Sequence, residues 1–146
     1  DARTKNDPSF SGPGVEFFDA MSSEDLATNI AATRAFVRIC FEKQPTQDEF
    51  ETMLGFNMMV PPKVRAAMLG RQLSMDDILK ALKLPVLVTH GSADKIILLA
   101  TGQYTAATIP NAKLSVYDGL GHSPFWEDTP RFNAELAAFV RTANGK

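Results

Sequence analysis

Two short stretches of the sequence contain the side chains best suited to acid–base chemistry: HGSAD at 90–94 and DGLGHSPFWE at 118–127. In the second stretch, the imidazole of His122, with an ordinary pKa of about 6.5, can accept and return a proton near neutral pH. In the first, the carboxylate of Asp94 can accept a hydrogen bond from Nδ1 of a histidine and stabilise the imidazolium. Nε2 of that histidine is then free to take a proton from a nucleophile. Asp94 and His122 are therefore the candidate acid and base of a catalytic site.

Each of these residues also has a structural explanation when it is taken alone. An aspartate after a strand is often a turn residue or a helix cap, and a single loop histidine is more often packed or at the surface. His90, the other histidine of the chain, precedes Asp94 by four residues. We interpret His90 as a structural hydrogen-bond donor in the turn. The catalytic interpretation of Asp94 and His122 depends on their positions after two consecutive strands.

Those strands are expected at 84–89 and 113–117. The first, LPVLVT, is a short apolar run without alternation, which is typical of a parallel strand buried on both faces. An apolar, alanine-rich segment at 98–109 predicts a helix between the strands, and Thr129 followed by proline begins a final helix that ends near residue 143. The order strand, helix, strand, helix predicts a parallel pair in a layered α/β sheet, which keeps its sites at the carboxyl ends of the strands.

The segment before the first strand is predicted to contain four consecutive helices, after a polar loop at 1–14. Each helix has a start signal, either an N-capping side chain or a first-turn proline, before apolar residues at helical spacing. These signals lie at Ser22-Ser23-Glu24-Asp25, at Thr46 with Glu49, at Pro62, and at Ser74 with Asp77. We expect the first of the four helices to continue to about residue 43.

Two parallel strands are too few for an independent sheet, and the first strand would expose unpaired backbone groups along one edge. We therefore expect this α/β chain to be part of a larger fold.

The residues resemble a known family, the α/β-hydrolases, especially its esterase-like and haloperoxidase-like members. The stretch LPVLVTHGSAD at 84–94 looks like the penultimate core strand and acid loop of that family. The stretch AKLSVYDGLGHSPFWEDTPRFNAELAAFV at 112–140 looks like its last strand, histidine loop and closing helix. The resemblance implies that Asp94 is the triad acid and His122 the base. Leu98 departs from the family pattern, since many relatives have a proline in this part of the acid loop.

The resemblance also implies a division of the chain into three parts. Residues 1–21 would be a linker from a preceding core half, residues 22–83 a helical cap, and residues 84–146 the C-terminal part of the α/β-hydrolase core.

The nucleophile of such an enzyme is expected in a G-x-S-x-G turn, and none of the serines of this chain lies in that pattern. The glycine-rich oxyanion motif is also absent from the sequence. By resemblance, both belong to an N-terminal half of the same enzyme, which we expect to be a partner of this chain. The chain alone is expected to be inactive, because a base without a nucleophile or oxyanion donors lacks most of the machinery.

All six methionines and four phenylalanines lie between residues 21 and 75, which suggests an adaptable apolar pocket between the cap and the catalytic loops. We expect Met53, Met58, Phe125 and Trp126 to contact the substrate, although ordinary packing also explains each of them. The pocket favours an ester, lactone or thioester with an acyl or aromatic group. The absence of tyrosine from the segment weakens an epoxide-hydrolase interpretation. A lactonase, a haloperoxidase or perhydrolase, a dehalogenase and a non-catalytic binding module of the same fold remain alternatives.

The composition excludes other classes of protein. The chain of 146 residues has a net charge of −2 and no long basic run, so no nucleic-acid partner is expected. No apolar stretch approaches the roughly 20 residues of a membrane span. Cys40, the single cysteine, cannot form an internal disulfide, and its helical context AFVRICF favours a packed thiol. We expect a cytoplasmic protein, with secretion left open, that needs no metal or other cofactor.

Overall fold

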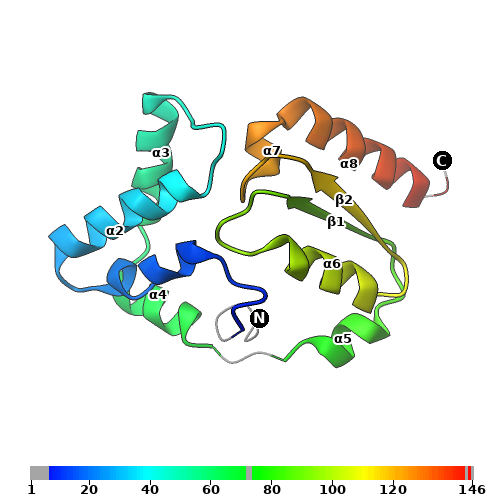
Figure 1. Ribbon diagram of the computed structural model, residues 1–146, viewed down its shortest axis with the longest axis horizontal. Helices are drawn as coiled ribbons and strands as arrows, with labels where there is room; N and C mark the ends of the chain where they lie inside the picture. Colours follow the sequence, from blue (N-terminus) through cyan, green and yellow to red (C-terminus); the bar gives the residue numbers. More distant parts are fainter. Residues whose placement is uncertain (1–6, 72–73, 144, 146) are drawn as a thin grey trace.

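The computed structural model of the chain describes residues 7–71, 74–143 and 145. Its elements form a group of helices beside a small sheet that is flanked by helices (Figure 1). The helical segments are η1 Pro13–Phe17, η2 Ala20–Ser22, α2 Leu26–Ile39, α3 Gln47–Met58, α4 Pro62–Leu69, α5 Asp76–Ala81, α6 Leu99–Thr108, α7 Pro124–Glu127 and α8 Thr129–Ala143, and the strands are β1 Val86–Gly91 and β2 Ala112–Tyr117.

The two strands are parallel, as predicted, with Val86 paired to Ala112 and Gly91 to Tyr117. Helices α6 and α8 lie on opposite sides of this sheet (Figure 1). Side chains of a pleated strand point to its two faces in turn, so β1 contributes residues to cavities on both sides of the sheet. Leu87 borders a cavity under α8, whereas Val88 and His90 border one beside α6. Both strands therefore end at the same edge, where the acid and base loops begin.

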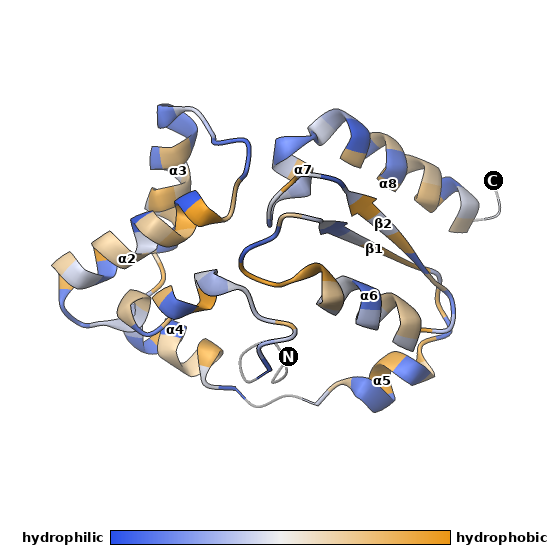
Figure 2. Cartoon of the chain, viewed as in Figure 1, coloured by the Kyte–Doolittle hydropathy of each residue, from blue (hydrophilic) through white to orange (hydrophobic). Residues whose placement is uncertain are grey.

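The described helical group contains α2, α3 and α4, which show apolar and polar residues interspersed along their length (Figure 2). The capping box at Thr46 is confirmed, because the Thr46 hydroxyl accepts from the Glu49 N–H and the Glu49 carboxylate accepts from the Thr46 N–H. Pro62 opens α4 as predicted. The expected cap at Ser74 is wrong: Met75 holds the N-cap position of α5 and makes no side-chain capping bond.

Several expected boundaries differ from the observed ones, and the largest differences are at the end of α2 and in β1. Helix α2 ends at Ile39 and not near residue 43, because the N–H groups of Glu42 and Lys43 donate to the Glu127 carboxylate and not to helical carbonyls. Strand β1 continues to Gly91 and therefore includes His90.

In its described part, the loop expected at 1–14 contains no helix or strand before η1 begins at Pro13, and η2 follows η1. Its residues up to position 6 lie outside the described part of the chain. Gly12 N–H donates to Ile96 O and Gly14 N–H to Lys95 O, so this segment runs directly against the acid loop. A Cβ on Gly12 would lie 2.3 Å from the Lys95 oxygen, which explains why glycine is needed at this approach.

Helix α5 lies next to α6 and away from α2–α4 (Figure 1). The Tyr104 hydroxyl of α6 donates to Asp76 of α5 at 3.0 Å. The proposed boundary of the cap at residue 83 remains a prediction, and this contact shows that α5 borders the sheet half.

The core joins the helical group to the acid loop. A buried cluster brings Val37, Cys40, Phe41 and Phe50 of the helical group together with Ile96 of the acid loop. Cys40 is buried there, and burial together with the nearby carboxylates of Asp94 and Glu127 raises the pKa of its thiol to about 12. No helix in the described part of the chain is long and apolar enough to cross a membrane.

Candidate active site

Asp94 is held in place by the backbone of its own loop. Its Oδ1 accepts hydrogen bonds from the N–H groups of Ile96 at 2.8 Å and Ile97 at 3.0 Å. The side chain is only 3% exposed. These bonds fix the carboxylate and leave Oδ2 directed at another partner, since a buried carboxylate must have its oxygens satisfied.

That partner is His122, whose Nδ1 lies 2.8 Å from Asp94 Oδ2. An ionised carboxylate can only accept, so Nδ1 carries the hydrogen and Nε2 has a free lone pair. The His122 side chain is 38% exposed and borders two cavities. The structure therefore brings the two predicted residues together in a geometry in which His122 can act as a base. Their catalytic roles remain predictions.

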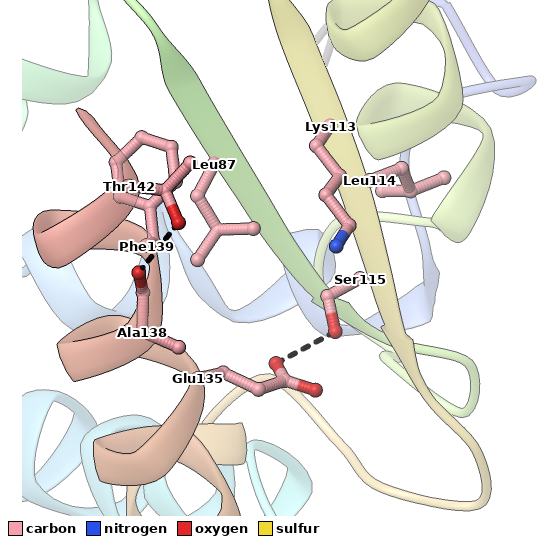
Figure 3. A pocket seen from close by; sticks show the side chains of 8 residues that line it. All are labelled: Leu87, Lys113, Leu114, Ser115, Glu135, Ala138, Phe139 and Thr142. Carbon is pink, nitrogen blue, oxygen red and sulfur yellow. Dashed lines mark hydrogen bonds between the residues drawn. The ribbon is translucent and has the colours of Figure 1, made fainter. Parts of the chain in front are cut away.

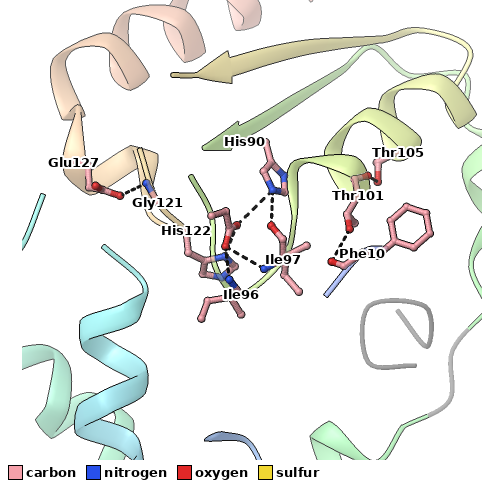
Figure 4. Close-up of polar contacts among 10 residues, drawn as sticks. Phe10, His90, Ile96, Ile97, Thr101, Thr105, Gly121, His122 and Glu127 are labelled. Atoms are coloured by element: carbon pink, nitrogen blue, oxygen red, sulfur yellow. Dashed lines mark hydrogen bonds and ion pairs between the residues drawn. The ribbon is translucent and has the colours of Figure 1, made fainter. Parts of the chain in front are cut away.

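His90 also approaches the Asp94 carboxylate, and Figure 4 shows its ring above Ile97. Its Nε2 is 2.8 Å from the Ile97 carbonyl and 3.4 Å from Asp94 Oδ2. Because a carbonyl only accepts, Nε2 must carry the hydrogen and is fully occupied as a donor. A Cβ on Gly102 of α6 would lie 2.7 Å from His90 Nδ1, so the ring is closely packed there. These contacts agree with a structural role for His90.

The acid and base loops approach each other too closely for side chains at their contact. A Cβ on Gly91 would lie 2.0 Å from the Gly121 carbonyl oxygen. The base loop also turns through Gly119, which has a φ of 69°, a conformation that glycine adopts without strain. The close approach of Gly91 to Gly121 sets the separation between the loops and thereby the distance from Asp94 to His122.

Glu127, which the sequence analysis did not single out, joins the base loop to the helical group. Its Oε1 accepts from the Gly121 N–H at 2.8 Å (Figure 4). Its Oε2 accepts from the N–H groups of Glu42 at 2.9 Å and Lys43 at 2.7 Å. The His122 N–H donates to the Cys40 carbonyl at 2.8 Å beside this junction. We call Glu127 and these backbone bonds the Glu127 latch.

Two cavities lie between the helical group and the catalytic loops. The first, of about 290 Å³, reaches His122 and is otherwise lined by Arg65 and eight apolar residues, Phe18, Met21, Phe36, Val60, Met68, Leu69, Ile96 and Ile97. We call it the His122 cavity. The second, of about 230 Å³, is bordered by Met53, Phe125 and Trp126, three of the four residues expected to contact substrate. Met58, the fourth, lines neither cavity.

Another cavity, of about 260 Å³, lies between the sheet and α8 (Figure 3). Two hydrogen bonds join its lining residues: the Ser115 hydroxyl donates to Glu135 at 2.7 Å, and the Thr142 hydroxyl donates to the Ala138 carbonyl at 3.1 Å. It contains neither histidine, and its floor is a sheet face away from the carboxyl ends of the strands. We therefore place the candidate site at the His122 cavity.

The described residues supply no nucleophile to His122. In that part of the chain, no serine hydroxyl is hydrogen-bonded to the His122 ring, and the Ser92 hydroxyl instead donates to Asp118 and accepts from Gly119 N–H. Within residues 7–71, 74–143 and 145, no group of three or more His, Cys, Asp or Glu side chains is arranged to hold a metal ion.

Comparison with known proteins shows which proteins this arrangement resembles. No protein-family model matches the chain. Over 67 residues, or 45% of the chain, it is 37% identical to a non-heme haloperoxidase of Rhodococcus erythropolis, of which the match covers 24%. An esterase from Rhodococcus sp. ECU1013 superposes on 91% of the chain with a TM-score of 0.85 and 29% identity. A putative aryl esterase from Burkholderia cenocepacia superposes on 95% with a TM-score of 0.88 and 26% identity.

The homologues and structural neighbours are esterases, haloperoxidases and hydrolases of the α/β-hydrolase fold, matched over only a C-terminal portion of their length. The chain spans about half the length of the two esterases, 49% and 52%. Its fold is that of part of an α/β-hydrolase, and the predicted fold class is confirmed at this level. The relatives also support the predicted relationship to hydrolases of the esterase and haloperoxidase type.

Proposed function

We propose that this chain provides the acid, the base and the cap of a serine hydrolase that cleaves carboxylic esters. The observation that carries the proposal is the Asp94–His122 hydrogen bond, which leaves Nε2 of His122 free beside an apolar cavity. In this role Asp94 fixes the tautomer of His122 and stabilises its protonated form.

The reaction proceeds in two halves. His122 takes the hydroxyl proton of the serine as its oxygen attacks the ester carbonyl carbon, and then gives that proton to the departing alcohol. Water, deprotonated by the same imidazole, next attacks the acyl-enzyme and releases the acid. The serine and the oxyanion donors belong to an N-terminal half that combines with this chain, since the 146 residues contain no G-x-S-x-G sequence.

Fluorophosphonate labelling of the complete enzyme, containing both halves, tests this proposal. We expect one labelled serine in the N-terminal half, ester turnover that depends on both halves, and loss of both properties in His122→Gln. Ser123→Ala, which removes the hydroxyl beside the base, is the matched control and should keep its label. If the complete enzyme takes no label and turns over no ester, the chain belongs to a non-catalytic binding protein instead.

The match to a haloperoxidase favours a second candidate activity at the same site. Hydrogen peroxide would replace water as the group that attacks the acyl-enzyme, and a peracid would leave in place of the acid. Measuring peracid-dependent bromination with acetate and peroxide tests this activity. If the enzyme brominates no faster than the His122→Gln variant, the perhydrolase activity is ruled out and ester hydrolysis remains the proposed function.

A further inference from the structure

The His122 cavity contains an unbalanced positive charge. Apart from the imidazole of His122, Arg65 is its polar lining residue, and no carboxylate lines it among the described residues. Its volume of about 290 Å³ is near the lower limit for small-molecule pockets, which begin at roughly 300 Å³. A guanidinium at one part of an apolar cavity and a base at another is an arrangement that could orient a ligand with two different ends.

Arg65 extends from α4 and is only partly satisfied by the protein. Its Nη2 donates to the Asn57 carbonyl at 2.6 Å. Its Nε is buried without a hydrogen-bond partner, and among the described residues no carboxylate pairs with the side chain. Burial lowers the pKa of the guanidinium, which reflects the cost of removing this charge from water. Arg65 is partly buried, and a ligand that carried a negative charge would compensate the part of the guanidinium that is removed from water.

The bond to Asn57 has a structural purpose that does not account for the whole guanidinium. Asn57 lies in the last turn of α3, where carbonyl groups lack helical partners and a cationic donor is favourable. One nitrogen is enough for this purpose, and lysine could provide it. The planar guanidinium has further donors, which suit a carboxylate.

We propose that Arg65 binds a carboxylate carried by the ester substrate, so that the enzyme prefers esters with an anionic group at the end of a short apolar spacer. This inference rests on the proposed esterase function and adds the substrate class. The apolar walls would hold the spacer, and the low local polarity would strengthen the ion pair. The carboxylate can be part of the acyl group or of the alcohol, and matched ester pairs distinguish the two sources.

Two pairs of esters test the proposal in the complete enzyme. On the acyl side, mono-4-nitrophenyl adipate is compared with 4-nitrophenyl hexanoate, which differs by a methyl group in place of the carboxylate. On the alcohol side, 3-acetoxybenzoate is compared with phenyl acetate. We expect Arg65→Met to lower kcat/KM for one charged ester about ten- to a hundredfold, because a charge-assisted hydrogen bond is lost. The neutral esters should change less than about threefold.

Two further variants separate recognition from folding. Lys63→Met removes a positive charge from an exposed position of the same helix and should leave all four rates unchanged. Arg65→Lys keeps the charge and a donor for the Asn57 carbonyl, and should lose only part of the preference, because an ammonium lacks the planar fork.

Each outcome has a distinct meaning. A selective loss for a charged ester in Arg65→Met, or a partial one in Arg65→Lys, supports the proposal. If charged and neutral esters fall together in both variants, or if neither falls, Arg65 serves only the packing of α3 and α4 and the proposal is wrong. If the enzyme hydrolyses none of the four esters and takes no fluorophosphonate, the esterase function itself fails.

Discussion

The catalytic loops and the helical group hold their residues by different means. In the loops, Asp94 and His122 are positioned by backbone hydrogen bonds and by the close approach of Gly91 to Gly121. In the helical group, the cavity walls are mostly apolar side chains, among which Arg65 has a single hydrogen bond. The candidate acid and base are thus fixed through the backbone, whereas the apolar cavity beside them is bounded by side chains that can repack.

The strongest test of this contrast removes the charge of Asp94 and keeps its shape. In Asp94→Asn, Oδ1 can still accept from the loop, but the amide facing Nδ1 favours the wrong histidine tautomer. We expect kcat of the complete enzyme for a 4-nitrophenyl ester to fall about 10⁴-fold. Asp118→Asn, which keeps an acceptor for the Ser92 hydroxyl, is the control. A loss of less than about tenfold in Asp94→Asn would mean that the acid lies elsewhere.

The next effect concerns Cys40, at the junction of the two regions. Its thiol has a pKa raised to about 12 by burial and by the carboxylates of Asp94 and Glu127. Compared with an ordinary thiol pKa of about 8.5, this lowers the thiolate fraction at pH 8 roughly a thousandfold. The folded chain should therefore react with iodoacetamide about a thousandfold more slowly than the chain unfolded in urea. Because Cys40 is the single cysteine, the rate reports one site, and a ratio below about ten would contradict the packing described.

The smallest effect comes from separating the two regions at the Glu127 latch. Glu127→Gln replaces one acceptor oxygen by an amide donor, which must face a backbone N–H of Gly121 or of Glu42 and Lys43. We expect the free energy of unfolding to fall by about 1–2 kcal/mol, measured by urea denaturation of this chain. Glu16→Gln, an exposed change in η1, should leave stability unaltered. Equal stability of the two variants would show that the latch contributes nothing.

Much of the sheet half could be predicted from the sequence because its signals are local. A buried parallel strand, the glycine-rich turns and the order of elements place Asp94 and His122 at one edge of the sheet. The capping box at Thr46 is local in the same sense. The N-cap predicted at Ser74 is wrong, because Met75 occupies the N-cap position of α5 and makes no side-chain capping bond. A short capping motif does not by itself show that the helix begins there.

The residues missed by the sequence analysis depend on distant contacts. Glu127 meets Glu42 across 85 positions of the chain, and no spacing pattern marks such a pair. Arg65 looks like an ordinary surface residue of an amphipathic helix until the cavity beside it is known. Met58 was expected to contact substrate only because methionines are frequent in the helical segment, which says nothing of where one side chain lies. In the structure it lines neither cavity.

The Glu127 latch also limits how a substrate can enter. Four hydrogen bonds connect the base loop and Glu127 to the end of α2. The His122 N–H donates to the Cys40 carbonyl, the N–H groups of Glu42 and Lys43 donate to the Glu127 carboxylate, and the Lys43 ammonium donates to the Glu127 carbonyl. A hinge that swung α2 away from the base would break all four, at a cost of about 2–6 kcal/mol. The open form would then make up between about 3% and less than 0.01% of the molecules. The end of α2 is therefore expected to stay in place beside the base. Substrate is then expected to enter, and product to leave, on the side of α4.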